Sequence, residues 1–178
     1  NIIYILADDL GYGDLSVYNQ NSKISTPNIN SIGNQGMIFS DMHSTSSVCT
    51  PTRYSILTGE YAWRTKLKEG VLWSYGEPLI PENKKTVGSM LKKFGYTTSV
   101  IGKWHLGSDP TGFDYWEILP GQGKYYNPDF KNQKGKAQYE GYCTDIVTDK
   151  AIAWLDKRDK NKPFMVMVQQ KAPHRNWN

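Results

Sequence analysis

Short apolar runs that end in polar side chains constrain the fold of this chain most strongly. Residues 1–7 (NIIYILA) and 164–168 (FMVMV) are continuous apolar runs, and residues 97–101 (TTSVI) favour a further strand. Short runs of this kind are typical of strands buried in a parallel sheet, so we expect residues 1–7 to form a buried central strand. Helical patterns at residues 86–94 and 141–158 separate the later runs. We therefore predict an α/β fold of alternating strands and helices, with its chemistry at the strand ends.

The remaining segments are less regular. Thr26-Pro27 is typical of a helix start, and Ile29 and Ile32 would give that helix an apolar side. A second strand is plausible at residues 37–42. The segment 61–81 is predicted to be an irregular surface segment, and residues 109–141 to be a long excursion that carries substrate contacts.

Composition narrows the function classes. A chain of 178 residues allows one compact domain with a sizeable core. Its net charge of +4 is mild, and no block of Lys and Arg indicates a nucleic-acid partner. No apolar run reaches the roughly 18 residues that a membrane span needs. Because the chain opens at Asn1 inside a strand pattern, we expect it to be trimmed, so the lack of a signal peptide says nothing about export.

Polar residues gather where the predicted strands end. Asp8 and Asp9 follow the first strand, and Lys103 and His105 follow the strand at 97–101. Ligands of open α/β sheets bind at the carboxyl ends of strands. Adjacent carboxylates need a cation beside them, and hard oxygen ligands suit Ca²⁺ or Mg²⁺. In isolation, Asp8-Asp9 is more often a solvated turn or a helix cap, and the second pair is more often a surface lysine and a histidine with its hydrogen bonds satisfied.

The stretch from Cys49 to Gly59 (CTPTRYSILTG) predicts a short helix with a reactive end. Pro51 suits the first turn, and Gly59 suits a left-handed cap. Arg53 follows Cys49 by four residues, so both side chains lie on one face. The amino end of a helix carries free N–H groups and partial positive charge, so this site suits a tetrahedral anion. Cys143, the other cysteine, is predicted to be a buried thiol.

The same stretch resembles the signature of the type I sulfatases, members of the alkaline phosphatase superfamily. That signature is Cys (or Ser), any residue, Pro, any residue, Arg, three of any residue, then Leu-Thr-Gly. Residues 7–14 (ADDLGYGD) resemble the opening motif of the family, and residues 102–107 (GKWHLG) its second signature. Pro173-His174 resembles a third, shorter site. The resemblance extends from Asn1 to about His174. It implies the family's fold, an α/β fold with a mostly parallel or mixed central sheet sandwiched by helices.

The resemblance implies a set of roles. Cys49 is oxidised to formylglycine (3-oxoalanine) by a maturation enzyme, and its hydrated aldehyde attacks the sulfur of a sulfate ester. Asp8, Asp9 and the modified Cys49 hold Ca²⁺, with Mg²⁺ as the alternative. The resemblance assigns catalytic roles to five residues: Cys49, Arg53, Lys103, His105 and His174.

The resemblance also implies a substrate and a location. Residues 121–128 (GQGKYYNP) and 172–177 (APHRNW) are most similar to sulfatases of sulfated glycans, N-acetylglucosamine-6-sulfatases above all. The expected substrate is a sulfated carbohydrate or aryl sulfate. Such enzymes act in the periplasm, in the lysosome or outside the cell.

Sulfatase chains are longer and bring further metal and sulfate ligands, so residues 1–178 are expected to be the N-terminal part of a catalytic domain. This chain alone should then be inactive. Two alternatives stay open: a phosphonate or phosphate ester hydrolase of the same superfamily, and an inactive fragment or binding module.

Overall fold

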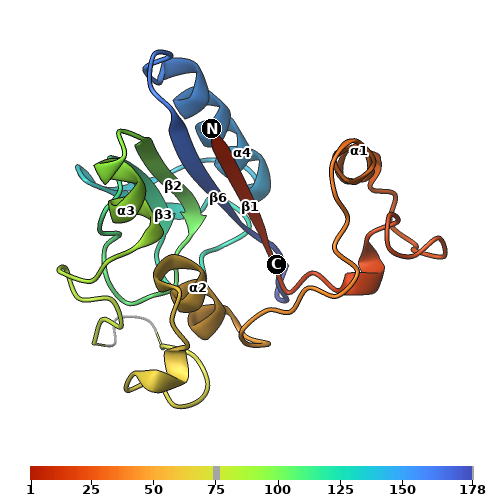
Figure 1. Ribbon diagram of the computed structural model, residues 1–178, viewed down its shortest axis with the longest axis horizontal. Coiled ribbons are helices and arrows are strands. Elements are labelled where there is room, and N and C mark those ends of the chain that lie inside the picture. Colours follow the sequence, from red (N-terminus) through yellow and green to blue (C-terminus); the bar gives the residue numbers. More distant parts are fainter. Residues whose placement is uncertain (74–76, 178) are drawn as a thin grey trace.

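A computed structural model describes residues 1–73 and 77–177 of the chain. Its centre is a six-stranded sheet in the order β1-β6-β2-β3-β4-β5 (Figure 1). The strands are β1 (Ile2–Asp8), β2 (Thr97–Lys103), β3 (Tyr115–Leu119), β4 (Asp129–Asn132), β5 (Gly135–Gln138) and β6 (Phe164–Pro173). The helices are α1 (Pro27–Gln35), α2 (Cys49–Thr58), α3 (Val87–Lys93) and α4 (Cys143–Lys157), with short 3₁₀ turns at Tyr12–Asp14 and Ala62–Arg64.

The sheet is mixed, as the sequence predicts. β6 lies between β1 and β2 and is parallel to both, and β3 is parallel to β2. β4 and β5 extend the sheet as an antiparallel meander. Residues 109–141 are therefore not a structureless excursion, because they contain three of these strands. β4 and β5 are short and polar, so they gave little periodicity to read.

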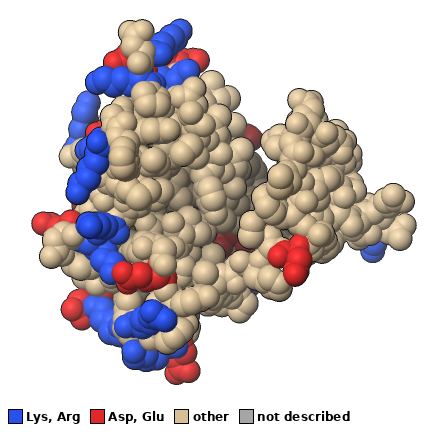
Figure 2. Space-filling model, in the orientation of Figure 1, with Lys and Arg blue, Asp and Glu red and all other residues tan. Residues whose placement is uncertain are grey.

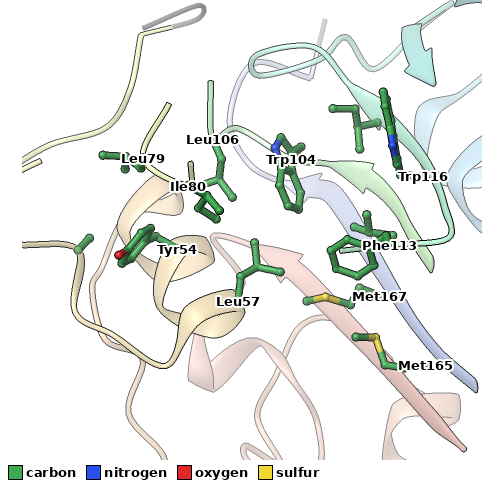
Figure 3. Close-up of a cluster of buried hydrophobic side chains, with 13 residues drawn as sticks. Tyr54, Leu57, Leu79, Ile80, Trp104, Leu106, Phe113, Trp116, Met165 and Met167 are labelled. Atoms are coloured by element: carbon green, nitrogen blue, oxygen red, sulfur yellow. The ribbon is translucent and has the colours of Figure 1, made fainter. Parts of the chain in front are cut away.

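One face of the sheet is covered by α2 and α3. Tyr54 and Leu57 of α2 pack with Met165 and Met167 of β6 and with Trp104, which follows β2 (Figure 3). Four of the five buried residues of α2 recur at the spacing of one helical face, namely Thr50, Arg53, Tyr54 and Leu57, and the fifth is Ser55. This core fixes the position of α2 against the strand ends.

The other face is covered by α4. Val147 and Ala151 of α4 pack against Ile101 of β2 and against Val166 and Val168 of β6. Along β6 the side chains alternate between this core and the opposite one, as expected for a strand buried on both faces. The chain thus forms a helix–sheet–helix sandwich, which confirms the predicted fold class.

β1 departs from its prediction. It is parallel to β6 but lies at the edge of the described sheet, and Ile3 and Ile5 are 54% and 63% exposed. The apolar run marks a strand with two apolar faces, but the described helices cover neither face. The predicted central position is therefore wrong for the described sheet.

Two further expectations near the N-terminus are wrong. Residues 37–42 contain a turn at residues 40–41 and no strand. The helix α1 does form, but Ile29 and Ile32 are exposed. Figure 1 shows α1 set apart from the sheet, and Figure 2 shows a hollow between the two. These apolar side chains have too few neighbours in the described chain to form a core.

The segment 61–81 is irregular apart from its 3₁₀ turn, as predicted, although residues 74–76 of it lie outside the described residues. The prediction that it lies on the surface is wrong in part, because Ala62, Leu79 and Ile80 are buried in the core with Tyr54 and Leu57 of α2. In the described part of the chain, no helix combines the length and the apolar character that crossing a membrane requires.

Candidate active site

The helix α2 begins at Cys49 and presents an open amino end. Val48 precedes the helix in an extended conformation, and its side chain provides no cap. The N–H groups of the first turn therefore stay available beside the Cys49 side chain. At the other end, Gly59 adopts the left-handed conformation at φ 70°, as the sequence predicts.

The end of β2 places a histidine against the cysteine. The Nδ1 atom of His105 lies 3.0 Å from Sγ of Cys49. His105 has a φ of 52°, an uncommon conformation for a residue other than glycine and one that concentrates at functional sites. The buried hydroxyl of Thr50 donates to the carbonyl oxygen of His105 at 3.1 Å and fixes this turn to α2.

Arg53 connects α2 to the sheet. Its guanidinium donates to the carbonyl oxygen of Lys103 and, at 2.7 Å, to Oε1 of Gln169. A second nitrogen lies 3.7 Å from the carboxylate of Asp8. Arg53 is 2% exposed, so its charge is held in place with little screening by solvent.

The carboxylates at the end of β1 face these cations. Asp8 is buried and forms an ion pair with Nζ of Lys103, which is itself fully buried. Asp9 has a φ of 65°, and its carboxylate lies 3.7 Å from Nε2 of His174. Asp8, Asp9, Cys49 and Arg53 line one pocket of about 310 Å³.

Burial lowers the pKa values of two basic side chains at this site, His105 and Arg53. Burial, together with the charge of Lys103, lowers the pKa of His105 to about 4. The imidazole is therefore neutral near pH 7, and one of its nitrogens can accept a proton. Burial also lowers the pKa of Arg53, while the nearby Asp8 and Cys49 act in the opposite direction. A guanidinium remains charged despite such a shift.

The end of β6 contributes residues that the sequence analysis did not single out. Gln169 binds Arg53, and Lys171 is 3% exposed with its ammonium 4.5 Å from the centre of the Tyr125 ring. Burial and the charge of Lys103 lower the pKa of Lys171. Both residues interrupt an apolar strand, and a polar residue within a buried strand is the signal that could have identified them.

The structure thus brings the predicted residues to one edge of the sheet. Cys49, Arg53, Lys103 and Asp8 lie in contact or share partners there, and His105 touches Cys49. His174 meets this group through Asp9 and lies at its margin.

Carboxylate oxygens are ligands that suit a hard divalent cation, but this site offers few of them. Asp8 and Asp9 offer carboxylate oxygens in the pocket that Cys49 also lines. Within residues 1–73 and 77–177, no group of three or more His, Cys, Asp or Glu side chains is placed to bind a metal ion. Ca²⁺ takes six to eight oxygen ligands, so these residues fit part of a calcium site.

The sequence of this chain is similar to those of known sulfatases. N-acetylglucosamine-6-O-sulfatase of Bacteroides thetaiotaomicron is 43% identical over 180 residues, which cover 99% of this chain and 31% of that protein. N-acetylgalactosamine-6-O-sulfatase of the same organism is 47% identical over 112 residues, covering 63% of this chain and 22% of that protein.

A solved structure of a protein in complex with its substrate, D-glucosamine-2-N,6-O-disulfate, superposes with a TM-score of 0.88 and 41% identity. The match covers 100% of this chain and 35% of that one. The chain therefore spans less than half the length of each of these relatives. The family model for sulfatases matches residues 1–178, so the chain belongs to the sulfatase family.

Proposed function

We propose that this chain is the N-terminal part of a sulfuric ester hydrolase that acts on sulfated glycans, and that this part carries the nucleophile. The contact between Cys49 and His105, 3.0 Å apart beside the buried Arg53, is the observation that carries the proposal. It joins a nucleophile position and a neutral imidazole beside a fixed cation. Such a constellation suits attack on a tetrahedral, singly charged sulfate ester.

The Cys49 thiol stands in for a formylglycine side chain, which a maturation enzyme would produce from it. The hydrated aldehyde supplies the hydroxyl that attacks sulfur. His105, with its neutral imidazole, orients that hydroxyl and accepts its proton. The uncapped amino end of α2 begins at Cys49 itself.

Arg53 and Lys103 hold the sulfate oxygens. Both side chains are buried, so their charges act at close range and are poorly screened. In the present structure Asp8 binds both of them, which keeps the two cations in position without substrate. Charge that develops on the sulfate oxygens during the reaction is stabilised by such fixed donors.

His174 serves the leaving group. Its imidazole lies at the margin of the site, 3.7 Å from the Asp9 carboxylate. A sugar hydroxyl is a poor leaving group, and a proton from His174 lets it depart as an alcohol. Lys103 assists by its positive charge.

Asp8, Asp9 and the modified Cys49 would hold Ca²⁺, with Mg²⁺ as the alternative. A divalent cation there supplies Lewis-acid polarisation of the sulfate. The further oxygen ligands come from outside residues 1–178, because these residues are the N-terminal part of a longer catalytic domain. The complete enzyme is exported to the periplasm, the lysosome or the cell exterior.

The substrate is a 6-sulfated N-acetylglucosamine unit. The relative with 43% identity across 99% of this chain is an N-acetylglucosamine-6-O-sulfatase. The relative named for N-acetylgalactosamine covers less of the chain, so the glucosamine configuration is the better supported.

The test compares turnover by the full-length protein of 6-sulfated and 3-sulfated N-acetylglucosamine, 6-sulfated N-acetylgalactosamine, and an aryl sulfate and aryl phosphate pair. We expect calcium-dependent hydrolysis of the 6-sulfated glucosamine and of the aryl sulfate. Peptide mass analysis should show Cys49 converted to formylglycine, and Cys49→Ala should abolish turnover while the protein stays folded.

Hydrolysis of the aryl phosphate in preference to the aryl sulfate would instead identify a phosphate ester hydrolase. An active enzyme with an intact Cys49 thiol throughout would refute the formylglycine mechanism. Preference for the 3-sulfated sugar would refute the proposed substrate alone.

A further inference from the structure

Tyr125, in the segment between β3 and β4, reaches across the end of β6. Its side chain is fully buried, and its hydroxyl donates to the carbonyl oxygen of His174 at 2.6 Å. The same hydroxyl lies 3.5 Å from the carbonyl oxygen of Lys171. Tyr125 therefore contacts the backbone of the turn that presents the His174 imidazole, and it does not line the pocket beside Cys49.

Tyr125 is itself firmly anchored. Its ring stacks on that of Tyr142, with centroids 5.9 Å apart and planes at 13°. Its carbonyl oxygen accepts a hydrogen bond from the N–H of Cys143 at 2.7 Å, at the start of α4. The Lys171 ammonium covers a face of the Tyr125 ring. The hydroxyl thus projects from a rigid base.

The turn that carries His174 lacks an equivalent support from the sheet. Leu6 pairs with Gln169, but Asp8 pairs with Pro173, so the register between β1 and β6 shifts just before this turn. His174 follows the last strand residue, with its N–H bonded to the carbonyl oxygen of Lys171 at 3.1 Å. A regular ladder therefore does not fix the angle at which the chain leaves β6.

We propose that Tyr125 is a positioning residue that holds His174 at the leaving-group side of the active site. The inference rests on the proposed function, in which His174 protonates the departing sugar oxygen. Displacement of a catalytic group by about 1 Å can lower the rate on the order of 100-fold. Burial and the neighbouring Tyr142 raise the pKa of Tyr125 to about 12, so its hydroxyl remains a donor at working pH.

The experiment uses Tyr125→Phe in the full-length protein, which removes the hydroxyl and keeps the ring. Tyr126→Phe is the matched control, because Tyr126 is 59% exposed and its hydroxyl has no hydrogen bond within the described residues. We expect Tyr125→Phe to lower kcat on a 6-sulfated sugar about 10-fold, with KM nearly unchanged. The loss on an aryl sulfate should be much smaller, because a phenolate leaves without a proton.

A double-mutant cycle with His174→Ala separates positioning from general loosening. If Tyr125 acts through His174, adding Tyr125→Phe to His174→Ala should cause no further loss of kcat. Equal losses on both substrates, a loss that adds to that of His174→Ala, or no loss at all would each overturn the inference. Wild-type turnover and its dependence on Cys49 test the proposed function separately.

Should Tyr125→Phe fold poorly, p-aminophenylalanine and p-chlorophenylalanine at position 125 replace it. The first keeps a donor at the ring tip and should retain the sugar-sulfate activity, whereas the second has a similar size but no donor and should lose it. Identical activities of the two would overturn the inference.

Discussion

At the scale of single residues, Arg53 joins three neighbouring strands through one guanidinium. It contacts Asp8 of β1, Gln169 of β6 and the carbonyl oxygen of Lys103 in β2. A lysine would keep the charge but lacks the planar set of donors. Arg53→Lys should therefore lower the free energy of unfolding by about 2–3 kcal/mol, because buried acceptors lose their partners.

Urea denaturation measures this change. Arg64→Lys is the control, since Arg64 is exposed and lies over the Trp63 ring, and it should change stability by less than about 0.5 kcal/mol. Similar losses in both variants would show that the three-strand contact contributes little.

Lys103 is the second residue whose loss should be measurable. Its ammonium is fully buried against Asp8, where it would also face sulfate. Lys103→Ala in the full-length protein should lower kcat about 100-fold or more, the effect of losing one fixed donor to a developing anion. Steady-state kinetics on an aryl sulfate check this, with the exposed Lys93→Ala as control. An unchanged kcat would remove Lys103 from the mechanism.

The sequence predicted the residues of the site that stand in local patterns, and missed those that act through tertiary contact. Cys49 and Arg53 share a helix face, and Lys103 and His105 follow a strand, so spacing places each pair. Gln169, Lys171 and Thr50 reach the site only because β6 and α2 meet at the end of β2. Polar side chains in a buried strand could have singled out Gln169 and Lys171, but no local pattern predicts that they meet Arg53 and Tyr125.

At the scale of elements, β2 and β6 approach closely at Gly102. Gly102 has a φ of 105° and pairs with Gln169, and a Cβ there would overlap the Gln169 carbonyl group. Gly102→Ala should destabilise the protein by about 3 kcal/mol or more, through both strain and overlap. Gly95→Ala is the control, because it has a φ of 81° but nothing within 4 Å, and should cost about 1–2 kcal/mol.

Thermal unfolding of both variants measures the difference. Equal melting temperatures for the two variants would mean that the strands can separate at Gly102 at no cost.

The contact between β3 and α4 is linked to pH through Glu117. This buried carboxylate accepts hydrogen bonds from Tyr115 at 2.6 Å, Tyr139 at 2.7 Å and Lys150 at 2.9 Å. Burial raises its pKa, but these bonds and the Lys150 charge outweigh burial and hold the pKa below the ordinary 4.5. The ionised form therefore stabilises the fold above pH 4.5, and this contribution is lost as the pH falls through the folded-state pKa.

Glu117→Gln removes the titration. The variant should lose about 2 kcal/mol at pH 7, because the Lys150 charge loses its partner. Its stability should then fall less steeply than that of the wild type below pH 4.5, as measured by denaturation across pH. Parallel curves would contradict a role for Glu117.

Element types were predictable from the sequence, and their places in the sheet only in part. The continuous apolar runs predicted the strands β1 and β6. Such a run fits a central strand or an edge strand, and only the neighbouring strands in the described sheet show which position each one takes. Residues 37–42 contain apolar side chains that suit a strand, yet in the part of the chain that the structure describes they pair with no strand. The polar strands β4 and β5 left no periodic signal.

At the scale of the whole molecule, apolar surface is exposed along β1 and around α1. Ile2, Ile3, Tyr4 and Ile5 are 38–63% exposed, on both faces of an edge strand. Figure 2 shows a broad face with few charged side chains, and Lys and Arg gathered along its margin. An uncovered apolar edge invites association between chains.

We therefore expect residues 1–178, produced alone, to bind Ca²⁺ feebly, to hydrolyse no sulfate ester, and to associate in solution. Calcium titration, an aryl sulfate assay and light scattering check this beside the full-length protein. Robust calcium-dependent hydrolysis by the short chain would contradict the proposal that the domain extends further.

The place of β6 between β1 and β2 has a consequence for the order of events during synthesis. Asp8 and Asp9 leave the ribosome early and Lys103 much later, yet the described sheet joins their strands only through β6, which emerges last of the three. Pairings so distant in sequence are slow to form. The pocket around Cys49 therefore closes late, and until then the cysteine remains on an open chain, within reach of any enzyme that modifies it.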